Sequence, residues 1–248
     1  KESALSHIGA VDLSKQGFDR DSLDMLLNKT KSKSIPDTLE LLVMRLNGKE
    51  QYLAQWPNYG EFAKVGKVLN AGATSRTSKD PRAIFKYSYS NISNWADPST
   101  AIIRGYLSNV YLEQWNAIAN IDKENQTIQM KYYNVSPGLK EGRTWRVLNV
   151  PEELDVPGEY FIDLNTMTLY FYPPYKISME DKLELAVTKD AQLKVTEAQH
   201  IVFDGLTFEG FRLTGDKMGL FDLLKTHYVE IRNCKFGYNA GGSAVIIK

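Results

Sequence analysis

The residues best suited to chemistry are carboxylates near the C-terminus of the chain. Asp204 and Glu230 stand on the outward side of an alternating apolar–polar pattern, and Glu209 and Asp216 extend that set. Two carboxylates about 5 Å apart, or further apart for inversion, are the usual groups that hydrolyse a glycosidic bond. Asp204 and Glu230 are therefore the candidate catalytic residues, although the sequence alone establishes a catalytic role for no residue.

The same pattern offers a simpler explanation for Asp204. A spacing of 28 residues, from 201 to 229, sets Arg232 directly beside Asp204. Neighbouring strands lie about 4.8 Å apart, so a surface ion pair between the two explains both residues. Such a pair contributes roughly 0–1 kcal/mol. We expect this ion pair rather than a catalytic carboxylate.

Aromatic side chains are a second source of candidate function. Four tryptophans and fourteen tyrosines could offer flat faces to sugar rings. In an all-β module most aromatic residues belong to the core or to cross-strand pairs. Trp95 and Trp115 are the candidate substrate-binding residues, because polar residues surround both of them in the sequence.

Other chemistries find no support in the residue spacing. His7, His200 and His227 lack the close spacing of a zinc motif, and the two later histidines fit turns before strands. Residues 241–243 are too few for a phosphate-binding loop, and no Gly-x-Ser-x-Gly elbow is present. We expect neither a metal nor a cofactor.

The composition excludes several classes of partner. Thirty basic and thirty acidic residues among 248 leave no net charge, so nothing points to nucleic acid. One cysteine excludes an internal disulfide framework. No apolar run reaches the length of a membrane span, and the first four residues do not open a signal peptide.

A repeat near the C-terminus predicts the architecture there. Residues 201–208 can be laid on residues 229–236, a spacing of 28, and residues 220–223 on 244–247, a spacing of 24. Short strands, turns and a repeat of this length are typical of a parallel β-solenoid. Leu206 and Cys234 fall on positions expected to face inward, and Gly205 and Asn233 on bends that favour left-handed backbone.

The rest of the chain predicts an all-β module of the sandwich or barrel kind at residues 39–188. A segment at 1–38 precedes it, with helical spacing at 21–28, and the solenoid occupies 189–248. Asn47-Gly48 predicts a two-residue hairpin turn, and Val147–Leu154 a short helical turn. The expected strands are 8–13, 39–46, 51–54, 83–87, 101–107, 111–121, 127–133, 159–163, 168–172 and 182–187.

Several short motifs run in a familiar order: Gln55–Gly60, Trp145–Asp155, Pro157–Tyr160, Pro173-Pro174 and His200–Phe208. In this order they resemble secreted bacterial right-handed parallel β-helix proteins, including glycoside hydrolases of the family 141 and family 120 type. In such proteins an all-β module interrupts the β-helix. Two features depart from that pattern. Gln55 stands where an arginine is expected, and residues 165–167 lack a turn glycine.

The resemblance implies a secreted or periplasmic carbohydrate-active protein whose partner is a polysaccharide or oligosaccharide of plant or algal origin. Its acid and nucleophile would come from coils beyond this segment. We expect a glycoside hydrolase, with a non-catalytic carbohydrate-binding or adhesive β-helix and a polysaccharide lyase as alternatives. Further coils or a second chain are expected to cover the edge at Val245–Lys248, through which the segment alone would self-associate.

Overall fold

The computed structural model describes residues 7–21, 43–72, 82–111, 113–132, 138–186, 193–209, 219–237 and 243–248. The chain divides into two compact units: one comprises Lys1–Leu39 and Tyr52–Ser178, the other Glu40–Gln51 and Met179–Lys248. The division falls inside one strand, between Gln51 and Tyr52. The domain limits expected from the sequence, at residues 38 and 188, stay a prediction.

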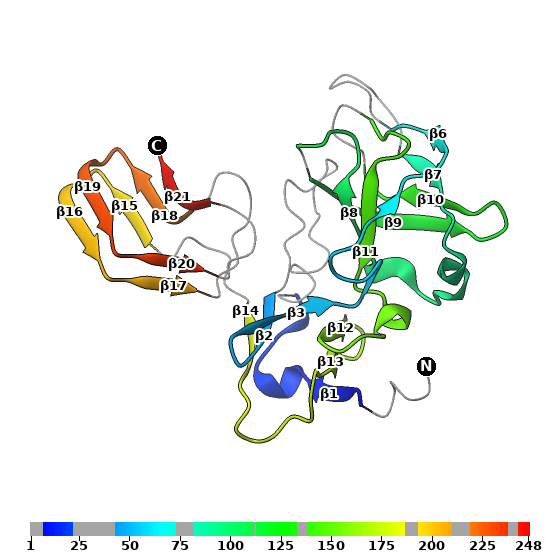
Figure 1. The fold of residues 1–248 in the computed structure, drawn as a ribbon, viewed down its shortest axis with the longest axis horizontal. Helices are drawn as coiled ribbons and strands as arrows, with labels where there is room; N and C mark the ends of the chain where they lie inside the picture. Colours follow the sequence, from blue (N-terminus) through cyan, green and yellow to red (C-terminus); the bar gives the residue numbers. More distant parts are fainter. Residues whose placement is uncertain are drawn as a thin grey trace. The chain divides into compact units, whose positions relative to one another are not determined.

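The first unit is built around an antiparallel sheet of eight strands (Figure 1). Its order is β4-β11-β8-β9-β10-β7-β6, with β5 beside β11, and every pairing in it is antiparallel. The elements are β4 (Gln55–Trp56), β5 (Ala63–Lys64), β6 (Val68–Asn70), β7 (Ile84–Lys86), β8 (Ile102–Tyr106), β9 (Gln114–Asp122), β10 (Thr127–Met130) and β11 (Thr144–Leu148), with short 3₁₀ helices η2 (Ser90–Asn94), η3 (Pro98–Thr100) and η4 (Pro151–Glu153).

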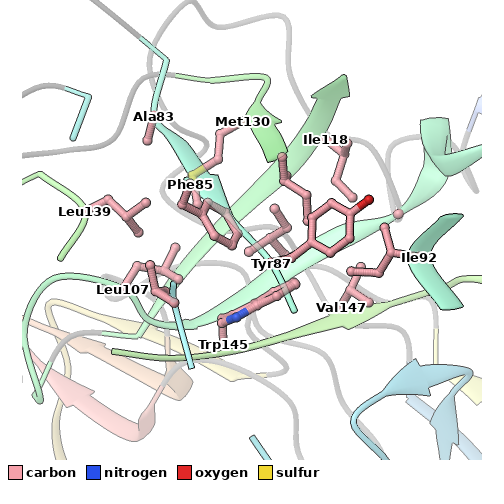
Figure 2. Close-up of a cluster of buried hydrophobic side chains, with 14 of the residues drawn as sticks. Ala83, Phe85, Tyr87, Ile92, Leu107, Ile118, Met130, Leu139, Trp145 and Val147 are labelled. Atoms are coloured by element: carbon pink, nitrogen blue, oxygen red, sulfur yellow. The ribbon is translucent and has the colours of Figure 1, made fainter. Parts of the chain in front are cut away.

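One face of this sheet buries the main hydrophobic core. Alternate residues of β7, β8 and β11 point into it, among them Phe85, Ile103 and Trp145, each at most 1% exposed. The rings of Phe85 and Trp145 meet edge to face with centroids 5.1 Å apart (Figure 2). Gly105 lies opposite Trp145, where a Cβ would stand 2.2 Å from the carbonyl oxygen of Thr144. Only glycine lets β8 and β11 approach this closely.

A smaller sheet in the same unit has the order β1-β13-β12-β3. The strands β12 (Glu159–Asp163) and β13 (Thr168–Tyr172) have the bounds predicted from the sequence. In place of a turn glycine, Met167 adopts a positive φ of 55°. The Asp163 carboxylate stabilises the turn, because it accepts the backbone N–H of Asn165 at 2.8 Å. The other elements here are β1 (Gly9–Asp12), η1 (Ser14–Gln16) and β3 (Lys49–Leu53).

The second unit opens with a hairpin and then changes to parallel pairing. β2 (Val43–Leu46) pairs with the start of β3 and with β14 (Leu183–Ala186). Asn47 and Gly48 both have positive φ, 50° and 75°, which confirms the two-residue turn predicted there.

The remaining strands repeat along the chain with the predicted spacings (Figure 1). β15 pairs with β18, β16 with β19 and β17 with β20, all in parallel and 28 residues apart, and β18 pairs with β21 at 24. The strands are β15 (Leu193–Thr196), β16 (Gln199–Asp204), β17 (Thr207–Glu209), β18 (Gly219–Leu224), β19 (His227–Arg232), β20 (Lys235–Gly237) and β21 (Ser243–Ile247).

The backbone repeats as well as the pairing. Positive φ recurs at 197 and 225, at 200 and 228, and at 205 and 233, so Gly205 and Asn233 are left-handed as expected. Phe203, Phe208 and Phe236 pack around Phe221, which is fully buried. These parallel strands thus share an apolar core of their own.

Three expectations need correction. Leu206 is 40% exposed and Cys234 is partly exposed, because both residues lie in the corners before β17 and β20, where strand alternation does not apply. Val147 and Leu148 belong to strand β11, so the helical turn is limited to Pro151–Glu153. Most sheets are antiparallel, and parallel pairing within the described residues is limited to β3 with β12 and to β15–β21.

Some expectations lie outside the described residues. They are Asp216, the phosphate-loop candidate at 241–242, and the helical segment at 21–28 apart from Asp21. What the structure establishes is an all-β chain.

Candidate functional site

The two candidate carboxylates lie on the outward face of β16 and β19. Arg232 Nε donates to Asp204 Oδ2 at 2.9 Å, and its Nη1 lies 3.4 Å from Glu230 Oε1. Asn233 Nδ2 also donates to Asp204 Oδ1, at 2.8 Å. The ion pair predicted as the simpler explanation for Asp204 is therefore present. Glu209 is likewise paired, with Lys235 at 2.6 Å. A catalytic role for Asp204 or Glu230 stays a prediction.

Trp95 does not have the exposed face expected of a sugar-binding residue. Its side chain is 1% exposed and packs in the main core. Its Nε1–H donates to Glu153 Oε1 at 2.7 Å, so the indole is satisfied inside the protein. The polar neighbours that favoured Trp95 lie in η2 and before η3, which wrap around a buried ring.

Trp115 is half-buried on β9, beside Arg104 on β8. The Arg104 guanidinium lies 4.3 Å from the centroid of the indole. Glu113 holds that guanidinium in a two-bond fork, at 2.6 and 2.7 Å. One face of the Trp115 ring is therefore already covered by a fixed cation, and sugar stacking on its other face stays a prediction.

A cavity of about 580 Å³ lies in the first unit, against the β12–β13 hairpin. Phe161 and Tyr170 face each other across the two strands, with ring centroids 6.2 Å apart and planes within 23°. Their neighbours in the strands, such as Tyr160, Ile162 and Phe171, point to the buried side. Period-two alternation thus presents two aromatic side chains to the cavity.

Polar groups complete the wall of this cavity, which we call the aromatic cavity. Asp97 and Thr100 come from η3 and its N-cap, and Asp163 and Asn165 from the hairpin turn. Asp97 Oδ1 accepts the Ser99 N–H at 2.9 Å, and Arg20 donates to Asn165 Oδ1 at 3.3 Å. These hydrogen bonds fix the carboxylates and the amide in position.

This arrangement is suited to binding a small, neutral and hydroxylated ring. The apolar C–H face of a sugar packs on aromatic rings, while its hydroxyls donate to fixed carboxylate and amide oxygens, and pockets of this size combine apolar walls with a few polar groups. The sequence analysis did not predict this site. Its lining residues come from 8–10, 97–100, 151–154 and 161–170, and no local pattern links them.

Glu159 is the carboxyl most altered by its surroundings, but it lies outside the aromatic cavity. It is 1% exposed, and burial raises its pKa to about 8. Oε2 is within 3.3 Å of the Asp155 N–H and 3.4 Å of the Val156 N–H, whereas Oε1 has no partner. A protonated carboxyl held by the loop before β12 is a structural group.

Two further searches concern the described residues alone. No group of three or more histidine, cysteine, aspartate or glutamate side chains among them could hold a metal ion. No helix in the same part of the chain is long and apolar enough to cross a membrane.

Comparison with known proteins yields a likeness of fold. No protein-family model and no curated protein matches the sequence. A solved structure titled "Glycoside hydrolase" is similar over 68% of this chain, with 16% identity and a TM-score of 0.51. The match covers 31% of that structure, so this chain spans about a third of its length. At this identity the likeness shows the fold alone.

Proposed function

We propose that this chain is part of a carbohydrate-active protein and that the aromatic cavity binds a sugar ring of a polysaccharide or oligosaccharide. The observation that carries the proposal is the pair of stacked rings, Phe161 and Tyr170, beside fixed polar groups in one cavity. The likeness of fold to a structure titled "Glycoside hydrolase" supports it, without bearing on the sugar.

The finer proposal is a glycoside hydrolase of plant or algal polysaccharide, secreted or periplasmic, in which the parallel strands β15–β21 belong to a β-helix. The repeated spacing and the repeated positive φ of those strands support the β-helix. A non-catalytic carbohydrate-binding protein is the second candidate. It is favoured by the carboxylates, because Asp204 is ion-paired and Asp97 and Asp163 cap turns.

Binding of neutral oligosaccharides tests the proposal. Isothermal titration of the chain with a panel of plant and algal oligosaccharides should find at least one ligand. Tyr170→Leu keeps apolar volume but removes the flat ring, so it should weaken that ligand at least tenfold. The matched control is Tyr111→Leu, because Tyr111 is 81% exposed and does not line the cavity. A panel without any ligand, or equal binding by Tyr170→Leu, would refute the proposed site.

Release of reducing ends from the same panel separates the two candidates. Turnover that depends on the protein supports the hydrolase, and binding without turnover supports the non-catalytic protein.

A further inference from the structure

A second cavity adjoins the aromatic cavity at Asp97, which lines both. Its volume is about 610 Å³. One wall is the stretch 118–121 of β9, and another is the chain at 95–99 before and within η3. Both cavities belong to the first unit, so their adjacency is a feature of a single compact body.

Three cationic side chains line this second cavity: Arg82, Lys123 and Lys131. Arg82 precedes β7 and Lys131 follows β10, and these two strand ends meet, since Met130 N–H donates to the Ala83 carbonyl at 2.9 Å. Lys123 follows β9 at the opposite end of β10. Antiparallel pairing therefore sets positive charge at both ends of one hollow.

The three charges are not neutralised by ion pairs. Lys123 Nζ donates to the Trp95 carbonyl at 3.3 Å, and Lys131 Nζ lies 5.7 Å from the centroid of the Tyr132 ring. No ion pair joins Arg82, Lys123 or Lys131 to a carboxylate within the described part of the chain.

Carboxylates near the second cavity do not cancel this charge. Asp97 is the one acidic residue on its wall among the described residues, and it caps η3. Glu152, which accepts the Ala96 N–H at 2.8 Å, lies close by without lining the cavity. In a chain of zero net charge, three cations against one acid make a local positive field that attracts anions.

We propose that the second cavity binds an anionic substituent, a carboxylate or a sulfate, of the glycan whose neighbouring ring lies in the aromatic cavity. The inference rests on the proposed function, because it assigns the acidic class to that same ligand. A guanidinium presents two parallel N–H donors to such a group, and two ammonium groups add charge. The shared Asp97 wall lets one chain of sugars span both cavities.

The test compares three oligosaccharides of equal length: a neutral one, a uronate and a sulfated one, each titrated calorimetrically into the intact chain. The double variant Arg82→Gln/Lys131→Gln and the single variant Lys123→Gln remove the positive charge. The matched control is Lys86→Gln, an exposed lysine on β7 that lines neither cavity.

We expect at least one acidic oligosaccharide to bind at least tenfold more tightly than the neutral one. The cavity variants should remove that preference, Lys86→Gln should retain it, and raising the salt concentration should weaken acidic ligands alone. Whether the uronate or the sulfated ligand prevails identifies the anion. Equal binding of neutral and acidic ligands, or a preference unchanged in the cavity variants, overturns this inference and leaves the proposed function intact. Absence of binding by all three overturns both.

Discussion

The carboxyl of Glu159 keeps its proton at neutral pH because it is buried. Its pKa in the folded chain is raised to about 8 from an ordinary value of 4.5. Between these two values the folded state binds a proton that the unfolded state has lost. The stability contributed by this proton is complete below pH 4.5 and is lost as the pH rises toward 8.

Replacing Glu159 by glutamine should remove this pH dependence. An amide imitates the protonated carboxyl, so the free energy of unfolding of Glu159→Gln should fall less between pH 5 and pH 8 than that of the wild type. The expected difference is at least about 1 kcal/mol. Urea unfolding at several pH values measures it, with Glu124→Gln in an exposed turn as the control. Parallel pH profiles for wild type and Glu159→Gln would contradict the buried, protonated state.

The ion pair of Asp204 with Arg232 should matter little for stability. Both side chains are about half exposed, 44% and 53%, so water and salt screen their attraction. A double-mutant cycle with Asp204→Asn and Arg232→Ala should give a coupling energy of about 0–1 kcal/mol, reduced further by salt. A coupling above about 2 kcal/mol would show that the pair is more than a surface contact.

Single residues were predictable where neighbours in the repeat determine their surroundings. Asp204 and Arg232 became partners because a spacing of 28 places them side by side. Trp95 was not predictable in this way. Its burial depends on Glu153, which lies 58 residues further along the chain and accepts its indole N–H. Polar neighbours in the sequence carry no information about such a distant partner.

At the scale of elements, two glycines should respond to alanine for different reasons. Gly205 has a φ of 71° and open space around a built Cβ, so Gly205→Ala should cost about 1–2 kcal/mol through backbone strain alone. Gly105→Ala should cost more than about 2 kcal/mol, because its Cβ would collide with Thr144. Gly237→Ala, where a Cβ meets ordinary contacts, is the matched control. Chemical denaturation of the three variants checks the order, and a Gly205→Ala loss equal to the Gly105→Ala loss would contradict it.

Strands with a clear local pattern were predicted well, and strands without one were missed. The bounds of β12 and β13 follow from alternation and from the turn between them. By contrast, β4, β5 and β6 are only two or three residues long, too short for any period to show. β11 was missed because its last residues run directly into the turn of η4.

At the scale of the whole molecule, both cavities depend on contacts between distant segments. Asp97 lines both of them, Phe161 and Tyr170 line one, and the cations that line the other follow different strands. Sequence reasoning could identify the all-β class and the repeat, because both are periodic. It could not identify the cavities, since they exist only once several segments have packed together.

The central claim is that a sugar ring lies against Phe161 and Tyr170. The most direct measurement is nuclear magnetic resonance of the intact chain with the tightest-binding oligosaccharide, in which intermolecular contacts from sugar protons are assigned. The account predicts contacts to the ring protons of Phe161 and Tyr170, absent for Tyr170 in the Tyr170→Leu variant. Contacts only to the exposed face of β16 and β19, such as those of Val202 and Tyr228, would contradict it.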